Sequence, residues 1–254
     1  MKLTFLGTGT SHGIPVPTCT CPVCLSSDSR DKRYRSSIMV QKEGKTLVVD
    51  TGPEFRLQAL RANILHIDFV LYTHCHADHF YGIDDLRVYC HDKPMPVYCD
   101  EDVKLAIERR FSYVLHDGPS LDGLPHLAPV VLEPWVKVNI DGFDITPVPI
   151  MHGRDIIYAY RIDDLVYATD CSGLISPDRA CSVLAEPKVL VVGALRYKAH
   201  PSHFCVEQSI EFARRIHARQ TYFTHMCHDL SHQRLCDELP ADIRPAYDML
   251  TLEV

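Results

Sequence analysis

The sequence predicts an α/β fold in which short β-strands alternate with amphipathic helices in a layered arrangement. Apolar runs of strand length recur from one end of the chain to the other. Between them, residues 54–62, 100–111 and 206–218 space their apolar side chains three or four apart, as amphipathic helices do. The chain of 254 residues can bury a large core. We find no linker that separates two parts, so we expect one domain over residues 1–254.

The apolar runs place the expected strands. These lie at residues 3–6, 36–41, 45–50, 68–72, 95–99, 144–150, 156–162, 165–170, 188–195, 220–225 and 249–254. A further helix is expected over 79–89, and Asp100 is expected to cap the helix that follows it. Residues 117–129, rich in Gly, Pro and Asp, predict a surface loop.

The composition is that of a soluble globular protein, with 46% apolar and 23% charged residues. A net charge of −7 argues against extended nucleic acid as a partner. No apolar run reaches the roughly 20 residues of a membrane span, and the first residues lack the apolar core of a secretion signal. With 11 cysteines and no export signal, we expect a cytoplasmic protein whose thiols are free or bound to metal. A homodimer is left open.

Histidine and aspartate crowd into the segment THCHADH, residues 73–79, directly after an apolar run. Neutral imidazole and carboxylate are ligands for zinc, manganese or iron. One ion could take His74 and His76, and a second ion could take Asp78 and His79. Three later strand ends supply further ligands, namely His152, Asp170 and His225. Seven ligands suit two divalent ions, with Asp170 placed to bridge them, and such a pair can clamp a phosphate and generate hydroxide near neutral pH.

A second cluster lies near the amino terminus, where CTCPVC places Cys19, Cys21 and Cys24 within six residues. This spacing is too tight for a relaxed disulfide between nearest partners and suits thiolates gathered on zinc. Structural zinc takes four ligands, and only three are local. We therefore expect a zinc-binding loop at about residues 17–26 whose fourth ligand lies elsewhere. Free thiols in a surface loop, or completion by Cys227, are the alternatives.

These residues resemble a known family. HCHADH fits the HxHxDH signature of the metallo-β-lactamase superfamily, and His152, Asp170 and His225 fit its later ligands in order. The resemblance covers nearly the whole chain and implies an αββα four-layer sandwich with the metals at one edge. Antibiotic-hydrolysing members lack a bridging aspartate. Asp170 instead resembles the phosphodiesterase and thioester hydrolase branches, and the adjacent Cys171 is expected to be a core thiol.

Within the superfamily, the cysteine loop together with HxHxDH resembles the PhnP-like phosphodiesterases. The resemblance implies that His228 is the fourth ligand of one structural zinc, beside two catalytic zinc or manganese ions. It also implies catalytic roles for Asp78, which would orient the attacking hydroxide or take its proton, and for His203, which would protonate the leaving oxygen. A helix-capping role for His203 is the alternative. The basic triplet 196–198 could bind phosphate oxygens, although such a triplet is more often a solvated loop.

The implied function is hydrolysis of a small cyclic phosphodiester, such as a phosphoribosyl cyclic phosphate. Two alternatives remain. A nuclease similar to tRNase Z is disfavoured because only 17 residues separate His152 from Asp170, which leaves no room there for an RNA-gripping insertion. A non-hydrolytic metal protein similar to PqqB is disfavoured because the HxHxDH motif is intact here. The remaining histidines, His66, His91, His116 and His217, are expected at the surface or at helix ends.

Overall fold

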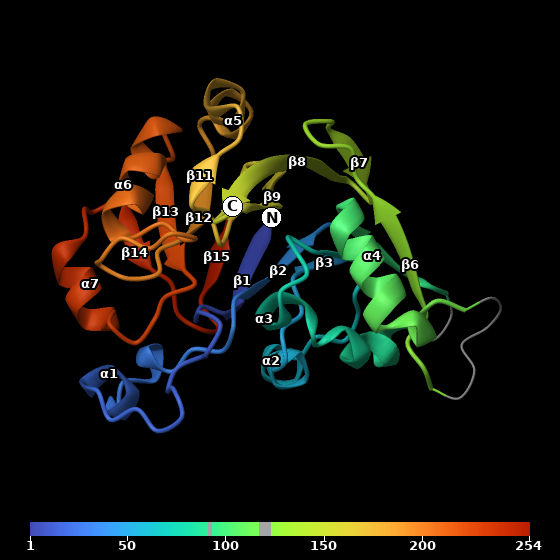
Figure 1. Ribbon diagram of the computed structural model, residues 1–254, viewed down its shortest axis with the longest axis horizontal. Coiled ribbons are helices and arrows are strands. Elements are labelled where there is room, and N and C mark those ends of the chain that lie inside the picture. Colours follow the sequence, from blue (N-terminus) through green and yellow to red (C-terminus); the bar gives the residue numbers. More distant parts are fainter. Residues whose placement is uncertain (91–92, 117–122) are drawn as a thin grey trace.

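The computed structural model describes residues 1–90, 93–116 and 123–254. Two β-sheets lie face to face, and helices cover the outer face of each (Figure 1). The described residues thus form the expected four-layer αββα sandwich.

The first sheet contains the amino-terminal strands and closes with the last strand of the chain. Its strand order is β15-β1-β2-β3-β4-β5-β6, antiparallel from β15 to β3 and parallel from β3 to β6. The strands are β1 (Lys2–Gly7), β2 (Ser37–Lys42), β3 (Lys45–Val49), β4 (Phe69–Leu71), β5 (Met95–Cys99), β6 (Leu127–Val131) and β15 (Thr251–Glu253).

The second sheet has the order β11-β8-β9-β10-β12-β13-β14, with β7 paired to β8. Strands β8 to β10 form an antiparallel meander, and β10, β12, β13 and β14 are parallel. The strands are β7 (Val138–Ile140), β8 (Phe143–His152), β9 (Asp155–Ile162), β10 (Leu165–Ala168), β11 (Gly173–Leu174), β12 (Val189–Gly193), β13 (Gln220–Thr224) and β14 (Ile243–Pro245).

The helices divide between the two outer faces. On the first sheet lie α2 (Phe55–Ala62), α3 (Ala77–Phe80) and α4 (Glu101–Arg110), with the 3-10 turns η2 (Ile83–Tyr89) and η3 (Ser112–Val114). On the second lie α5 (Pro177–Leu184), α6 (Val206–Arg215) and α7 (His232–Glu238). A short α1 (Pro22–Leu25) and η1 (Ser29–Asp31) belong to a loop that lies beside α7 (Figure 1).

The core has three layers of apolar contacts. Side chains of both sheets meet in the middle layer, among them Phe5, Phe69 and Tyr160, which are fully buried. Each outer layer joins one sheet to its helices. Full burial of one large apolar side chain stabilises the fold by about 1.5–3 kcal/mol, so these layers hold the strand ends at fixed positions.

All eleven expected strands are confirmed, and so are the helices at 54–62, 100–111 and 206–218 within a few residues of their ends. Asp100 caps α4, accepting a hydrogen bond from the Val103 N–H at 2.8 Å. The helix over 79–89 is wrong. It is broken at Gly82 between α3 and η2, where an added Cβ would lie 2.2 Å from the Gly52 carbonyl oxygen.

The expected loop at 117–129 is partly wrong, because β6 already begins at Leu127. Residues 117–122 of the expected loop lie outside the described residues. So does His91, which was expected at the surface or at a helix end.

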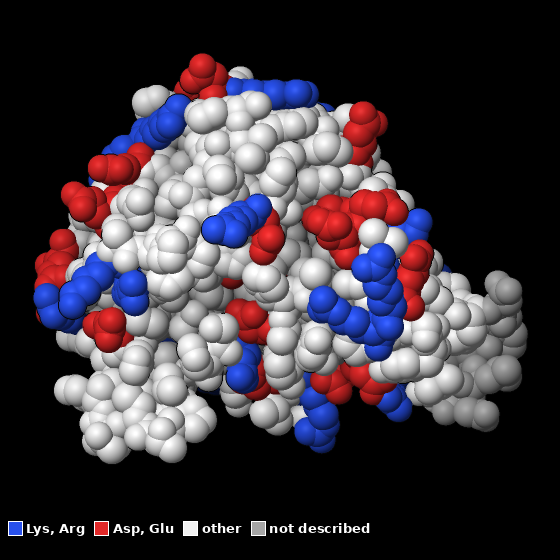
Figure 2. All heavy atoms as spheres, viewed as in Figure 1, with Lys and Arg blue, Asp and Glu red and all other residues white. Residues whose placement is uncertain are grey.

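On the face seen in Figure 2, acidic and basic side chains are interspersed, and no continuous basic surface forms there. Among the described residues, no helix combines the length and the apolar character that a membrane crossing demands.

Candidate metal centre

The expected ligands meet at one edge of the sandwich because of strand direction. Strands β4, β10 and β13 run in the same sense as their parallel neighbours, and β8 has the same direction as β10. The carboxyl ends of β8, β10 and β13 therefore lie at one edge of the second sheet, and the 3.8 Å approach of His74 to Asp170 places the end of β4 beside them. That edge carries the segment 73–79 after β4, His152 at the end of β8, Asp170 after β10 and His225 after β13.

Three residues that follow strands β3, β10 and β13 have an unusual backbone. Asp50, Asp170 and His225 have φ angles of 63°, 53° and 55°, in the left-handed region that side chains disfavour. Each such residue costs on the order of 1 kcal/mol and persists where its surroundings enforce it. The turn directs all three side chains into the buried interior of the edge, where each is at most 2% exposed.

A first group of possible ligands consists of His74, His76 and His152. The ring centroids of His74 and His76 are 4.6 Å apart, and that of His152 lies 5.4 Å and 5.0 Å from them. The Nε2 atom of His152 lies 3.2 Å from Nδ1 of His76. Three imidazoles with ring nitrogens this close together form a site for a divalent ion.

A second group consists of Asp78, His79, Asp170 and His225. The Nε2 atom of His79 lies 3.2 Å from Asp78 Oδ2 and 3.4 Å from Asp170 Oδ1. The Nε2 atom of His225 lies 3.3 Å and 3.2 Å from the same two oxygens. Ligand atoms bound at about 2.1 Å to one ion are about 3.0–3.4 Å apart, so the spacing fits an ion at the centre.

Asp170 joins the two groups. Its Oδ1 atom faces His79 and His225, whereas its Oδ2 atom lies 3.8 Å from His74 Nε2 and 3.7 Å from His152 Nε2. Each carboxylate oxygen therefore points toward one of the two groups. This is the arrangement expected of a carboxylate between two ions.

Hydrogen bonds with neighbouring groups fix the tautomers of two histidines. The Ser202 carbonyl oxygen can only accept, so His152 donates from Nδ1 at 2.7 Å. His79 likewise donates from Nδ1 to Asp50 Oδ2 at 2.8 Å. The Nε2 atom of each ring then faces carboxylate oxygens, an arrangement that calls for a cation, either a proton or a metal ion, between the two atoms.

Buried polar atoms without partners support the same fit. The Nε2 atoms of His74 and His79 are buried and make no hydrogen bond within the described residues. Burial lowers the pKa of His74 well below its usual value, which favours the neutral imidazole that binds metal. Burial would raise the pKa of Asp170, but His225 and His79 hold it well below the usual range. His74 therefore presents a neutral nitrogen and Asp170 charged oxygens, the forms that a divalent ion requires. Burial would lower the pKa of His79, but the carboxylates of Asp170, Asp78 and Asp50 raise it well above the usual value, so without a metal ion a proton is favoured at this position.

Asp50 is a residue of the site that the sequence reasoning missed. Its fully buried carboxylate holds His79 and also accepts bonds from the Thr73 N–H and hydroxyl, at 2.8 Å each. Such partners orient a metal-binding histidine. Asp50 ends the expected strand 45–50, and the other aspartate and histidine clusters also lie at strand ends. This shared position could have indicated that Asp50 belongs to the site.

His203 lies over the site but outside both groups. Its ring stacks on His225 with centroids 4.9 Å apart, and its Nδ1 atom is 3.8 Å from Asp170 Oδ2. Burial lowers its pKa to about 3. The first residue of α6 is Val206 and its cap is Cys205, so a capping role for His203 is wrong. Its nitrogen is also near enough to Asp170 and His152 to act as a further ligand.

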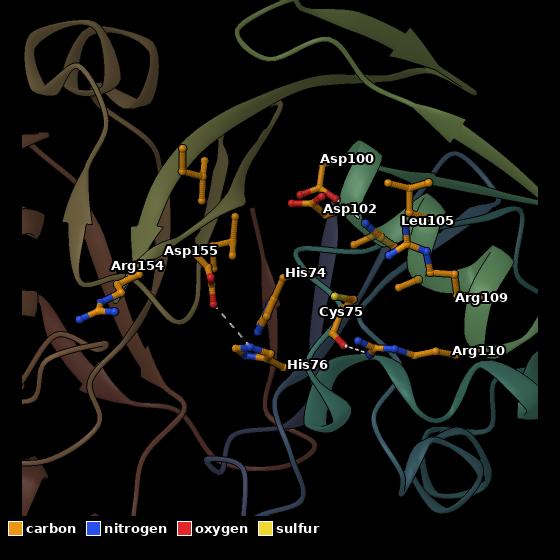
Figure 3. Close-up of a pocket in the computed structure, with 14 residues that line it drawn as sticks. His74, Cys75, His76, Asp100, Asp102, Leu105, Arg109, Arg110, Arg154 and Asp155 are labelled. Atoms are coloured by element: carbon orange, nitrogen blue, oxygen red, sulfur yellow. Dashed lines mark hydrogen bonds and ion pairs between the residues drawn. The ribbon is translucent and has the colours of Figure 1, made fainter.

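A large cleft of about 560 Å³ opens beside His74 and His76. Its walls come from α4 and from the turn between β8 and β9 (Figure 3). Arg110 donates to the Cys75 carbonyl oxygen at 3.1 Å, and Asp155 lies 3.8 Å from His76. Arg109 and Arg154 also line the cleft, so it offers both charges next to the first histidine group.

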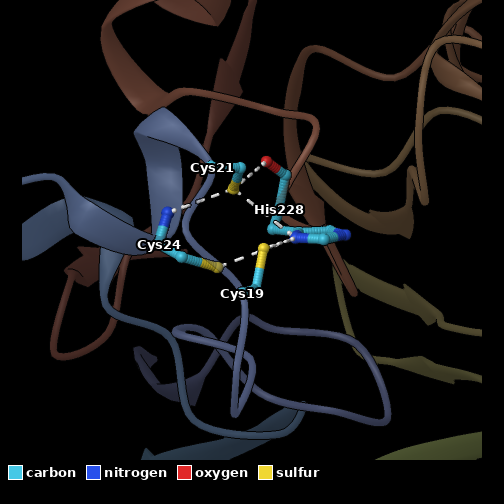
Figure 4. A group of neighbouring side chains, drawn as sticks. All are labelled: Cys19, Cys21, Cys24 and His228. Atoms are coloured by element: carbon cyan, nitrogen blue, oxygen red, sulfur yellow. Dashed lines mark hydrogen bonds between the residues drawn. The ribbon is translucent and has the colours of Figure 1, made fainter.

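The cysteine loop meets His228 (Figure 4). The Sγ atoms of Cys19, Cys21 and Cys24 lie 3.1, 3.5 and 3.6 Å from His228 Nδ1. A tetrahedral zinc, with bonds of about 2.3 Å to sulfur and 2.0 Å to nitrogen, separates these atoms by about 3.5 Å. The backbone N–H of Cys24 is the main cause that lowers the pKa of Cys21 to about 7. The four side chains therefore fit a structural zinc.

A buried ion pair stands behind this cluster. Arg33 is 1% exposed and donates to Asp31 at 3.3 Å and to the Leu230 carbonyl oxygen at 2.8 Å. Asp31 in turn accepts from the His232 N–H at 2.8 Å. These bonds join the cysteine loop to the segment that carries His228, although some 200 residues separate them in sequence.

The other sequence candidates divide by their contacts. Arg196 donates to the carbonyl oxygens of Lys198 and Ala199, and Tyr197 donates to Glu238 at 2.6 Å. Both side chains thus hydrogen-bond to neighbouring protein groups at the surface. Cys171 is confirmed as a core thiol, and burial raises its pKa to about 12. His66 is confirmed at the surface, where its side chain is 63% exposed.

Comparison with known proteins yields one family and several relatives. The model of the beta-lactamase superfamily domain matches residues 45–226. An octanoyltransferase of Porphyromonas gingivalis is 36% identical over 253 residues, covering 98% of this chain and 51% of that protein. The chain thus spans about half the length of that relative. A ribonuclease Z of Alkaliphilus oremlandii is 30% identical over 88 residues, 34% of this chain and 23% of that protein.

Among solved structures, a diphosphatase described as new and from the PhnP family is 38% identical, with a TM-score of 0.91. The match covers 99% of this chain and 96% of that one. The family match, the HxHxDH segment and the paired ligand groups agree with one another. The chain therefore belongs to the metallo-β-lactamase superfamily, as a PhnP-like member.

Proposed function

We propose that the protein is a metal-dependent hydrolase of small phosphodiesters, and that its substrate is a cyclic ester such as a phosphoribosyl cyclic phosphate. The observation that carries this proposal is the position of Asp170, whose two oxygens face two separate ligand groups. A carboxylate shared by two ions creates the paired site used in phosphoryl hydrolysis.

In this proposal one ion would be held by His74, His76, His152 and Asp170, and the other by Asp78, His79, Asp170 and His225. Two such ions, when bound, would polarise a phosphoryl oxygen and lower the pKa of water toward neutrality. Asp78 orients the attacking water through the carboxylate oxygen that faces His79 and His225. His203 protonates the leaving oxygen; an anionic substrate beside its ring would raise its pKa from the low value that burial causes.

A diphosphate is a second candidate substrate, favoured by the description of the 38% identical structure as a diphosphatase. The large cleft beside His74 and His76 carries Arg109 and Arg154, which could hold an additional phosphate.

The two alternatives are less well supported. The ribonuclease Z match covers 34% of this chain, and the face seen in Figure 2 lacks a continuous basic surface for a long RNA. A metal carrier without activity would not require a complete set of seven ligands arranged around two positions.

The test is a kinetic screen of the metal-loaded protein. The substrates are a ribose cyclic phosphate, bis-p-nitrophenyl phosphate, a 2′,3′-cyclic nucleotide, a nucleoside diphosphate and an octanoyl thioester. We expect the highest kcat/KM with the ribose cyclic phosphate and loss of activity after chelation. A preference for the nucleoside diphosphate would select the second candidate, and turnover of the thioester alone would refute both.

A further inference from the structure

We infer that a second, smaller cleft binds the alcohol portion that leaves from phosphorus, and that His12 and His200 select a hydroxylated, sugar-like alcohol. This inference rests on the proposed phosphodiesterase function. The cleft has a volume of about 250 Å³ and lies between the metal centre and the cysteine loop. His203 lines one side, and His228 of the cysteine cluster lines another.

The position of His203 decides which part of the substrate lies here. The group that donates a proton to the leaving oxygen must be within hydrogen-bond reach of that oxygen. His203 lines the smaller cleft, whereas His74 and His76 line the larger one. The leaving oxygen and its carbon skeleton therefore point into the smaller cleft. In a cyclic phosphate the sugar carries the leaving oxygen, so the sugar lies on this side as well.

The walls of the cleft are built before any ligand binds. Three loops form them: the residues after β1, the segment between β12 and α6, and the segment between β13 and α7. Backbone hydrogen bonds join all three, from Thr10 N–H to the Met226 carbonyl oxygen at 3.2 Å and from Cys227 N–H to that of Leu195 at 2.9 Å. A preformed cleft of this kind pays little ordering entropy on binding and favours one ligand shape.

The lining groups match hydroxyls. The Ser202 N–H donates to Nδ1 of His200 at 3.3 Å, so the neutral ring carries its proton on Nε2 and can donate from there. His12 is exposed and has no hydrogen bond within the described residues, and Thr10 and Ser11 add hydroxyl groups. Drug-sized ligands fill about 300–1,000 Å³, so a cleft of this size suits a pentose rather than an oligonucleotide.

Variants of His12 test the inference, because this exposed side chain lies outside the two ligand groups. In His12→Ala, we expect kcat/KM for a ribose cyclic phosphate to fall about tenfold, mainly through KM, the scale of one lost hydrogen bond. The fall in kcat/KM on bis-p-nitrophenyl phosphate should be smaller, because its leaving phenolate carries no sugar hydroxyl for His12 to bind. His12→Gln, which keeps hydrogen-bonding capacity, should recover part of the loss.

His66→Ala is the matched control, an exposed histidine that lines neither of the two clefts, and should keep both activities. A binding readout without turnover uses D-ribose: the ring resonances of His12 and His200 should shift on titration while that of His66 does not. Equal losses on both substrates, or no shifts with D-ribose, would overturn the inference and leave the phosphodiesterase proposal intact. A parent protein inactive on every phosphodiester would instead defeat the proposed function, and the inference with it.

Discussion

The side chain of His203 is close enough to the metal centre to be either a proton donor or a ligand, and one substitution separates these roles. In His203→Ala, a proton donor predicts a loss of about 10²–10⁴ in kcat on a substrate with an alkoxide leaving group. The loss on bis-p-nitrophenyl phosphate should be much smaller, because phenolate leaves without protonation. The measurements are kcat on both substrates and metal content.

The outcome distinguishes the roles. Unchanged metal content together with unequal losses supports a proton donor. A missing ion and the loss of both activities would mean that His203 is a ligand, as its 3.8 Å distance to Asp170 allows. An equal fall on both substrates with metals retained would contradict both roles.

Asp50 is not one of the seven ligands, yet it holds the ring of the ligand His79 in place. We expect Asp50→Asn to weaken binding of one ion about 10–100-fold, because removing such a partner typically has this effect on metal affinity. The measurement is a metal titration with a competing chelator. Asp68→Asn is the control, another buried carboxylate that accepts from the Thr46 N–H. Equal affinities for parent and Asp50→Asn would contradict the positioning role.

The ligands could be predicted from the sequence because metal chemistry restricts the residue types and HxHxDH fixes their local spacing. Asp50 was missed because a single aspartate after a strand is common, and its role depends on the approach of β3 to β4. His12 and Arg109 could not be assigned either. Their positions beside the site result from the packing of segments that are distant in sequence, and no local pattern in the sequence indicates that packing.

At the scale of elements, the cysteine loop is the part whose stability depends most on metal. Replacement of Cys21 by Ala leaves three ligands at a site that takes four, so binding energy that contributes to folding is lost. We expect Tm to fall by roughly 5–10 °C, since 1 kcal/mol corresponds to about 2–4 °C in a chain of this size. The activity of the folded fraction should fall less.

Cys236→Ala on α7 is the control for this loop, because Cys236 belongs to none of the groups of possible metal ligands. Differential scanning fluorimetry with zinc present measures both variants. Identical Tm values for Cys21→Ala and the parent would mean that the thiols hold no structural ion.

A buried carboxyl joins the end of β1 to the carboxyl-terminal segment and gives the fold a pH dependence. Asp248 accepts from the Thr8 hydroxyl at 2.8 Å and the Tyr34 N–H at 2.7 Å. Burial raises its pKa from 3.8 to about 6. Between these values the folded state binds the proton more tightly than the unfolded state, so the free energy of unfolding falls as pH rises from about 4 to 6.

Asn imitates the protonated carboxyl. Asp248→Asn should therefore remove the fall in the free energy of unfolding between pH 4 and 6 that Asp248 causes, about 1–3 kcal/mol. Urea unfolding of the parent and the variant at several pH values, both in chelator, measures the difference. Asp178→Asn, an exposed change on α5, should follow the parent. Parallel pH profiles for Asp248→Asn and the parent would contradict the prediction.

Elements with strong periodic patterns were predictable, and short or irregular ones were not. The missed strands β7, β11 and β14 have three, two and three residues, too few for a periodic signal. Strand β6 contains a proline and lies at the sheet edge, where proline is tolerated. The helix expected over 79–89 failed because Gly82 sits against the Gly52 carbonyl oxygen, a contact between distant segments.

For the whole molecule, the two ligand groups and the cysteine cluster predict three metal ions per chain. The ion held by three thiolates should resist mild chelation, whereas the pair at the open edge should leave first. Elemental analysis before and after dialysis against a chelator measures this. A single ion per chain after metal supplementation would contradict the count.

The ligands of each paired ion come from both sheets, with His74, His76, Asp78 and His79 following a strand of the first and His152, Asp170 and His225 following strands of the second. Bound ions would therefore add a link between the two halves of the sandwich at this edge, beside the backbone hydrogen bond from the Tyr158 N–H to the Thr73 carbonyl oxygen at 3.0 Å. Local opening of either sheet near this edge would have to release ligands from both. Bound ions would thus couple the fluctuations of the two sheets more tightly at this edge, and amide hydrogen exchange at the ends of β4 and β13 would then depend on metal occupancy.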